Sequence, residues 1–261
     1  MSRKDAEMSK IPVEPNVLLY YFVDLQTKLP DTITVLLAGQ EALLIDTAFP
    51  EYAARVKEDL AGQGMAVKKI VLSHYHADHV SGCPVFAPCD IYAGEFYEYN
   101  FNNCQIWEPY FTYLRPTHLL RHQDTLAFGA FSLRFLYAPG HSKCSMITRV
   151  TADIIHVGDL LMQTKDGKAA LPFIADGGSF SEHIDSLAGI KKLAPEAIIV
   201  PHGGLFRGRQ EIAQMVDDRV CYLEKTSSTM GTLPLPACLL HDISAYDHLE
   251  FHDTNILRLM V

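Results

Sequence analysis

Three histidines and one aspartate stand within six positions of the segment VLSHYHADHV, residues 71–80. Imidazole and carboxylate groups are ligands that proteins offer to zinc, and also to iron or manganese. Packing alone is a poor reason to gather four such groups, because each needs a polar partner when it is buried. The segment therefore predicts one half of a metal site. Its candidate ligands are His74, His76, Asp78 and His79.

Three further residues of ligand type follow apolar runs later in the chain: His141 in APGHSKC, Asp159 in HVGDLL and His202 in VPHGG. Each lies beside Gly or Pro, and glycine lets the backbone approach a site closely. Taken singly, each is better explained as a histidine bonded to a carbonyl or as an aspartate that caps a turn. Taken with the first cluster, they predict strand ends that converge on one edge of a folded sheet.

Short β-rich runs and helical patterns alternate in an order typical of two β-rich halves with helices outside. The first histidine cluster directly follows one such run, so we expect it on the loop that leaves a strand. Strands are expected at 17–23, 33–38, 42–46, 67–72, 131–137, 145–150, 154–157 and 197–200, and helices at 51–61, 180–193 and 207–225.

The 261 residues include 31 acidic and 22 basic side chains, which gives a net charge of −9. Because binding to a phosphate backbone needs clustered Lys and Arg, we expect no nucleic-acid partner. No apolar run approaches the length of a membrane span, and the polar start MSRKDAEMSK lacks the apolar region of a signal peptide. We therefore expect no membrane partner and a cytoplasmic protein whose six cysteines stay reduced.

Residues 92–113 contain nine aromatic side chains, including the single tryptophan, Trp107. Such a segment is explained by a small satellite core, by a wall or lid over a pocket, or by a contact in a homodimer. Because the segment lies between the first cluster and His141, we expect it to form a wall of the substrate pocket, with Tyr97, Trp107 and Phe111 in that wall.

The ordered motifs HxHxDH, GH, GD and PHG, which hold the seven candidate ligands, resemble those of the metallo-β-lactamase-fold hydrolase superfamily from about residue 17 to 204. Asp46 in LLIDTAF matches an early structural aspartate of that family. The resemblance implies an α/β fold, an αβ/βα four-layer sandwich with the metal site at the sheet edge. We expect a tail at 1–16, this domain at 17–225 and an extension packed on it at 226–261.

The resemblance also implies two divalent metal ions, with zinc as the first choice and iron or manganese as alternatives. By position, one ion would be bound by His74, His76 and His141, the other by Asp78, His79 and His202, and Asp159 would bridge them. Asp78 and Asp159 are the catalytic candidates, since a carboxylate can orient a metal-held hydroxide or pass its proton to the leaving group. The implied reaction is hydrolysis of a small thioester, ester or lactone with an apolar part.

Within the superfamily, the glyoxalase II, lactonase and thioesterase branch fits the chain length best. Flavodiiron relatives carry Glu at the position of His76, the lactonase tyrosine after Asp159 is missing, and the basic residues with which glyoxalase II binds glutathione are not evident in 221–261. Two alternatives stay open: a mononuclear iron dioxygenase acting on thiol or persulfide compounds, and a metal-bound signalling or sensor protein with vestigial activity. Lys143 either steadies an anionic substrate or is a solvated surface residue. Four histidines match no motif and are expected to be structural: His118, His122, His156 and His183.

Overall fold

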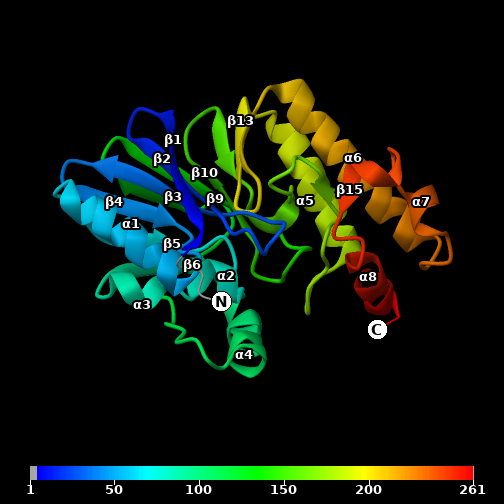
Figure 1. Cartoon of the computed structure of the whole chain (residues 1–261), viewed down its shortest axis with the longest axis horizontal. Coiled ribbons are helices and arrows are strands. Elements are labelled where there is room, and N and C mark those ends of the chain that lie inside the picture. Colours follow the sequence, from blue (N-terminus) through cyan, green and yellow to red (C-terminus); the bar gives the residue numbers. More distant parts are fainter. Residues whose placement is uncertain (1–4, 261) are drawn as a thin grey trace.

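A computed structural model describes residues 5–260, whose strands form two large sheets that pack face to face (Figure 1). Within this range, the first sheet has seven strands in chain order: β1 (Glu7–Glu14), β2 (Val17–Val23), β3 (Asp31–Ala38), β4 (Glu41–Ile45), β5 (Ala66–Val71), β6 (Asp90–Gly94) and β7 (His118–Leu120). The second has six described strands, in the spatial order β14 (Gly204–Arg207), β13 (Ala197–Val200), β11 (Ile154–His156), β10 (Met146–Arg149), β9 (Phe131–Tyr137) and β8 (Thr125–Phe128). A small third sheet pairs β12 (Ala169–Ala170) with β15 (Tyr246–Asp247).

Helices cover the outer faces of both large sheets. Those that matter for the site are α1 (Pro50–Gly62), α2 (Ala77–Val80), α4 (Tyr97–Trp107), α5 (Phe180–Leu193), α6 (Arg209–Ser228) and α8 (Phe251–Leu259). Two short ones, α3 (Cys83–Phe86) and α7 (Leu235–Cys238), complete the set of α-helices in the described chain. Figure 1 shows α1 outside the first sheet and α5 and α6 outside the second.

Apolar clusters hold these layers together. Leu19 of β2 and Phe135 of β9 are fully buried in the cluster between the two sheets. Tyr52 of α1 packs on the other face of the first sheet. Leu187 of α5 and Val216 of α6 do the same on the second sheet. The resulting helix–sheet–sheet–helix order confirms the predicted αβ/βα four-layer sandwich.

The strands of the second sheet run so that three candidate ligands emerge at one edge. β9 and β11 both pair antiparallel with β10, and β13 pairs parallel with β11, so β9, β11 and β13 share one direction. The segments that follow them carry His141, Asp159 and His202. In the first sheet, β5 lies parallel between β4 and β6, and His74 follows its end.

The start of α5 supports the turn that carries His141. The Ser179 hydroxyl accepts a hydrogen bond from the Glu182 backbone N–H, an N-cap worth about 1 kcal/mol. Gly140 lies against this first turn with a φ of +129°, and a Cβ on it would stand 2.2 Å from His183 Cα. Only glycine permits this approach, which explains the Pro-Gly turn before His141.

The structure bears on two terminal segments, the tail expected at 1–16 and the extension expected at 226–261. Residues 1–16 do not form a tail throughout, because Glu7–Glu14 pairs antiparallel with β2 as an edge strand; residues 1–4 lie outside the described range. Pro12 and the exposed charges of this strand hid its β pattern, and both are tolerated at a sheet edge. The extension after residue 225 packs into the same core as α5 and α6, through Cys238, Leu239 and Tyr246. No helix between residues 5 and 260 has the length and apolarity to cross a membrane.

Candidate metal centre

The structure brings the seven predicted ligands to one edge of the sandwich. Their donor atoms form groups in which all atoms lie within 4.8 Å of one another. The groups are His74, His76 and His141; His74, His79 and Asp159; and Asp78, His79 and His202. Occupation of these groups by metal stays a prediction, and so do the roles of individual residues.

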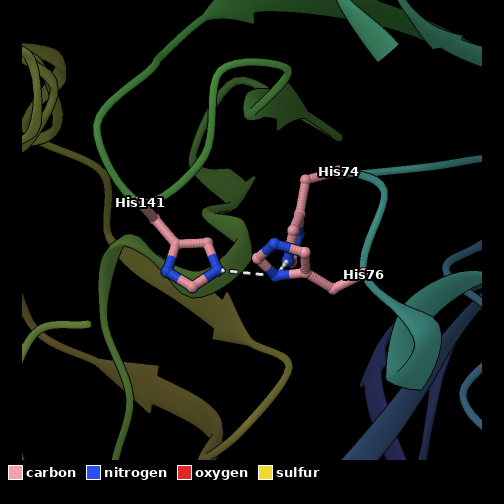
Figure 2. A group of neighbouring side chains, drawn as sticks. All are labelled: His74, His76 and His141. Atoms are coloured by element: carbon pink, nitrogen blue, oxygen red, sulfur yellow. Dashed lines mark hydrogen bonds between the residues drawn. The ribbon is translucent and has the colours of Figure 1, made fainter. Parts of the chain in front are cut away.

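Three histidines from two loops point their ring nitrogens at a common point (Figure 2). His76 Nδ1 lies 2.9 Å from His74 Nε2 and 3.1 Å from His141 Nε2. His74 and His76 are two residues apart on the loop between β5 and α2, and His76 has extended backbone dihedrals. Three imidazole nitrogens at such distances match the donor set of a catalytic zinc site with one open position.

The chain turns from extended to helical directly after His76, and this change separates the two donor groups. His76 is the extended N-cap of α2, and Asp78 and His79 lie within the helix. Asp78 Oδ2 stands 3.1 Å from His202 Nε2, and Asp78 Oδ1 stands 3.8 Å from His79 Nε2. A four-residue segment therefore supplies ligands to both groups.

Asp159 stands between these groups. Its Oδ2 lies 3.4 Å from His79 Nε2 and 3.5 Å from His202 Nε2 on one side. On the other side it lies 3.6 Å from His141 Nε2 and 3.8 Å from His74 Nε2. One carboxylate oxygen in this position can contact two cations at once, as the bridging role requires.

The ring nitrogens of His141, His202 and His74 that point away from the donor groups each have a hydrogen-bond partner, which fixes the orientation of the ring. His141 Nδ1 lies 2.8 Å from Phe173 O, and His202 Nδ1 lies 2.8 Å from Pro30 O. A carbonyl oxygen can only accept, so both Nδ1 atoms carry the proton and both Nε2 atoms present a lone pair to the site. His74 Nδ1 lies 3.0 Å from the Ser73 hydroxyl.

Asp46 orients His79 in the same way. Its Oδ2 lies 2.9 Å from His79 Nδ1, and the backbone N–H and hydroxyl of Ser73 donate to Asp46 at 2.7 Å each. The residue is fully buried and has a φ of +60°, a left-handed conformation that aspartate adopts more readily than most residues. The aspartate expected to be structural is thus the hydrogen-bond partner of a candidate ligand.

Burial and charge divide the histidines into two classes. Burial lowers the pKa of His74, His76 and His141, the last to about 4, so these rings are neutral. Burial would also lower the pKa of His202, but Asp159 and Asp78 raise it to about 10. In the metal-free chain, the positive charge of protonated His202 therefore offsets part of the negative charge of Asp78 and Asp159.

The pKa of His79 is raised in the same way as that of His202. Burial would lower it, but the negative charges of Asp159, Asp78 and Asp46 raise it well above the usual value. Burial would raise the pKa of Asp159, but His79 and His202 hold it well below its usual range. His79 Nε2 and Asp159 Oδ1 are buried and have no hydrogen-bond partner within residues 5–260. Orphaned donor and acceptor atoms at the centre of a His/Asp cluster fit a divalent cation such as zinc, iron or manganese.

A pocket of about 530 Å³ opens onto the cluster. α4 contributes one part of its lining and α8, with the irregular segment 173–176, another. Both helices lie on the lower side of the molecule in Figure 1. Apolar side chains supply much of the lining: Leu29, Ala77, Cys104, Trp107, Met162, Phe173, Ala175 and Phe251.

The aromatic segment 92–113 provides only part of the expected wall. Trp107 lines the pocket, with 71% of its surface exposed. Tyr97 packs in the core with its ring centre 5.5 Å from that of Tyr75, and Phe111 packs 5.9 Å from Phe49. The expectation that Tyr97 and Phe111 face the substrate is therefore not met, because the inner face of α4 and the chain after it anchor the segment to the first sheet.

Several residues were missed or misjudged at the sequence level. Asn100 is buried on α4, with its amide nitrogen 3.5 Å from His76 Nε2, and no motif marks it. Phe251 and Arg258 bring the C-terminal extension into the pocket. Lys143 is exposed and is absent from the pocket lining, which agrees with a solvated lysine. The four histidines without a motif lie outside the donor groups found in residues 5–260.

Comparison with known sequences finds a matching family profile and several similar proteins. A profile of the Metallo-beta-lactamase superfamily matches residues 27–202. The Beta-lactamase-like protein 2 homolog of Drosophila melanogaster is 24% identical over 183 residues, which are 68% of this chain and 60% of the fly protein. The Atrochrysone carboxyl ACP thioesterase of Aspergillus fumigatus is 40% identical over 48 residues, 18% of this chain and 11% of that protein. The matches thus span under two thirds of each relative's length.

Solved structures share the fold at low sequence identity. A metallo-beta-lactamase from Pontibacter korlensis superposes with a TM-score of 0.68 at 14% identity, covering 84% of this chain and 99% of that one. A metallo-beta-lactamase family protein from Thermus thermophilus gives a TM-score of 0.66 at 18% identity, covering 84% and 83%. The profile match over most of the chain, the four-layer sandwich and the His/Asp cluster at its edge agree: this chain belongs to the metallo-β-lactamase superfamily.

Proposed function

We propose that this protein is a metal-dependent hydrolase that cleaves a small thioester, ester or lactone with an apolar acyl part. The observation that carries the proposal is the position of Asp159, whose Oδ2 lies within 3.8 Å of ring nitrogens from both donor groups. A carboxylate between two donor groups suits a pair of ions, and paired ions serve hydrolysis at acyl and phosphoryl centres.

Bound divalent ions would lower the pKa of a coordinated water toward roughly 7 and polarise the carbonyl of the substrate. Asp78 and Asp159 both line the pocket, and Asp78 is the more accessible of the two, with 34% of its side chain exposed against 5% for Asp159. The proposed role of Asp78 is to accept a proton from the attacking water and pass it to the leaving group. Asp159 stays buried and ionised, so its proposed part is to hold the two donor groups together.

The pocket lining supports an apolar acyl group. Trp107, Phe173 and Phe251 offer ring surfaces beside the cluster. Arg258 is the one Lys or Arg side chain among the lining residues of the described chain, and it is paired with Asp176. A guanidinium has five N–H donors, so Arg258 keeps donors for a polar or acidic group of the substrate. The similarity over 48 residues to a protein named as a thioesterase makes thioesters the first substrates to test.

The experiment is a turnover assay on metal-free chain reloaded with zinc, manganese or iron. The substrates are thioesters, esters and lactones of graded acyl length, with phosphodiesters as a contrasting class. We expect metal-dependent cleavage of at least one acyl class, and loss of turnover in Asp78→Asn. Lys143→Ala is the matched control, because Lys143 is exposed and does not line the pocket.

Two other outcomes correspond to the alternative functions. One iron per chain, with oxygen uptake in the presence of a persulfide and no hydrolysis, would replace the hydrolase by a dioxygenase. Tight metal binding with no turnover of any substrate class would favour a signalling or sensor protein. Either result contradicts the proposed reaction.

A further inference from the structure

The carbonyl that orients His141 belongs to a segment without regular structure. Phe173 O accepts the hydrogen bond from His141 Nδ1 at 2.8 Å, and residues 171–175 form neither helix nor strand. Sheet or helix hydrogen bonds therefore do not fix the direction in which this carbonyl points. Something outside the segment has to set the plane of the peptide between Phe173 and Ile174.

Asn255 of α8 provides that constraint. Its Oδ1 accepts from the Ile174 N–H at 2.9 Å, and its Nδ2 donates to Pro172 O at 2.7 Å. The side chain is fully buried, and a backbone N–H can only donate while a carbonyl can only accept, so the amide has one orientation. Asn255 thus holds the peptide groups on both sides of Phe173.

The Ile174 N–H and the Phe173 C=O belong to the same peptide unit and point in opposite directions across it. A continuous hydrogen-bonded chain therefore runs from Asn255 Oδ1 through this peptide to His141 Nδ1. Hydrogen bonds in such a chain polarise one another, and a carbonyl that accepts from a ligating imidazole raises the basicity of its other nitrogen. Both effects act on His141 Nε2, which faces the three-histidine group.

We propose that Asn255 is a positioning residue for the three-histidine group and that α8 is in this way a part of the metal centre. The inference rests on the metal-binding part of the proposed function and not on the substrate. Residues in the outer shell of a metal site typically change metal affinity about 10- to 100-fold when they are replaced. We expect a loss of that size at the three-histidine group when the two hydrogen bonds between Asn255 and residues 172–174 are removed.

The test uses the full chain and Asn255→Leu, which keeps the branched side-chain shape and the number of heavy atoms and removes the two bonds to residues 172–174. Cobalt(II) is titrated into metal-free protein, its affinity is measured against a chelator, and its visible spectrum is recorded. We expect affinity about 10- to 100-fold lower and an altered cobalt spectrum. Asn255→Asp keeps an acceptor for the Ile174 N–H, so it should lie closer to the parent than the leucine variant does.

Tyr222→Phe is the matched control for general destabilisation. Its hydroxyl lies 3.0 Å from Asn255 Nδ2 and 3.1 Å from His252 Nδ1 in the same buried network, and neither of these contacts reaches residues 172–174. The variant should lower the melting temperature and leave the cobalt affinity and spectrum at parental values. If leucine prevents folding, Asn255→Ala replaces it in the same titration.

A folded Asn255→Leu or Asn255→Ala chain with parental cobalt affinity and spectrum would overturn the proposal. An equal loss of affinity in Tyr222→Phe would also overturn it, since that substitution leaves in place the two bonds between Asn255 and residues 172–174. Because the readout is metal affinity, a failed turnover assay on a parent that binds cobalt overturns the proposed reaction alone. A parent chain that binds no cobalt removes the metal centre and this inference with it.

Discussion

Asp46 Oδ2 lies 2.9 Å from His79 Nδ1, so a carboxylate that follows β4 holds a candidate ligand that follows β5. We expect Asp46→Asn to weaken metal binding at the Asp78, His79 and His202 group by about 10- to 100-fold, because the charge that orients His79 is lost. Competition titration with a chelator measures the effect. Asp153→Asn, at an exposed aspartate, should leave affinity unchanged, and equal effects in the two variants would contradict this role.

Asp159 offers a direct test of the bridging position. Asp159→Ala should bind fewer divalent ions per chain than the parent and lose turnover by more than about 100-fold, since a shared ligand matters more than an outer-shell partner. Elemental analysis of the purified variant gives the ion count. Full metal content in a folded Asp159→Ala chain would place the carboxylate outside the ligand set.

Metal binding should release protons from the second donor group. The pKa of His202 is raised to about 10 by Asp159 and Asp78 against the effect of burial, and that of His79 is raised well above normal in the same way. Both rings are therefore protonated in the metal-free chain and must lose a proton to bind an ion. At about pH 6, below the ionisation of metal-bound water, we expect about two protons released per chain.

Calorimetric titration in buffers of different ionisation enthalpy counts these protons. His202→Gln removes one of the two protonated rings, so its count should fall to about one. A parent chain whose binding enthalpy does not depend on the buffer releases no protons, and the charge balance described for the site would be wrong.

Acid should destabilise the metal-free chain partly through His183. Burial lowers the pKa of this ring to about 4, while its Nε2 lies 3.0 Å from Leu160 O. Below about pH 6.5 the unfolded chain gains a proton there and the folded chain does not. The free energy of unfolding therefore falls as the pH drops from about 6.5 to about 4, by on the order of 3 kcal/mol from this residue.

Denaturant unfolding at several pH values measures that slope. His183→Gln should be less stable at neutral pH and should lose stability less steeply between about pH 6.5 and about pH 4. His118→Gln is the control, because His118 is exposed. Parallel curves for His183→Gln and the parent would show that His183 does not carry this linkage.

The pocket predicts which aromatic side chains set acyl-chain preference. Trp107→Ala and Phe251→Ala should lower kcat/KM for long acyl chains about 5- to 30-fold relative to short ones, as expected for the loss of about 1–2 kcal/mol of apolar contact. Tyr97→Ala should lower the melting temperature and keep the parental preference, because Tyr97 packs in the core. A preference that changes in Tyr97→Ala and not in Trp107→Ala would reverse this assignment.

The sequence predicted those parts of the fold that depend on local pattern. The strand expected at 131–137 and the helix expected at 180–193 have the bounds of β9 and α5. The candidate ligands could be found because all seven are of metal-binding residue types and, taken together, they follow the ends of several apolar strands. That is why the residues of the cluster could be named before their distances were known.

Other features depend on contacts between distant parts of the chain and leave no local pattern. Asn255 is one polar residue in a short helix, and only the fold brings it to residues 172–174. Asn100 and Arg258 likewise gain their places from the packing of α4 and α8 around the pocket. Composition predicts Tyr97 and Phe111 in the pocket wall, but composition does not say which face of α4 is buried or where the chain after α4 packs.

The ligand groups join residues that follow strands of both sheets: His74 and His79 come from the first, and Asp159 and His202 from the second. An ion held by them would act as a non-covalent staple across the sandwich, and its binding energy would add to the free energy of unfolding. At a free metal concentration about 1,000 times the Kd, this linkage amounts to about 4 kcal/mol. Metal starvation would then shorten the lifetime of the folded chain in the presence of proteases, so metal supply would set the amount of protein as well as its activity.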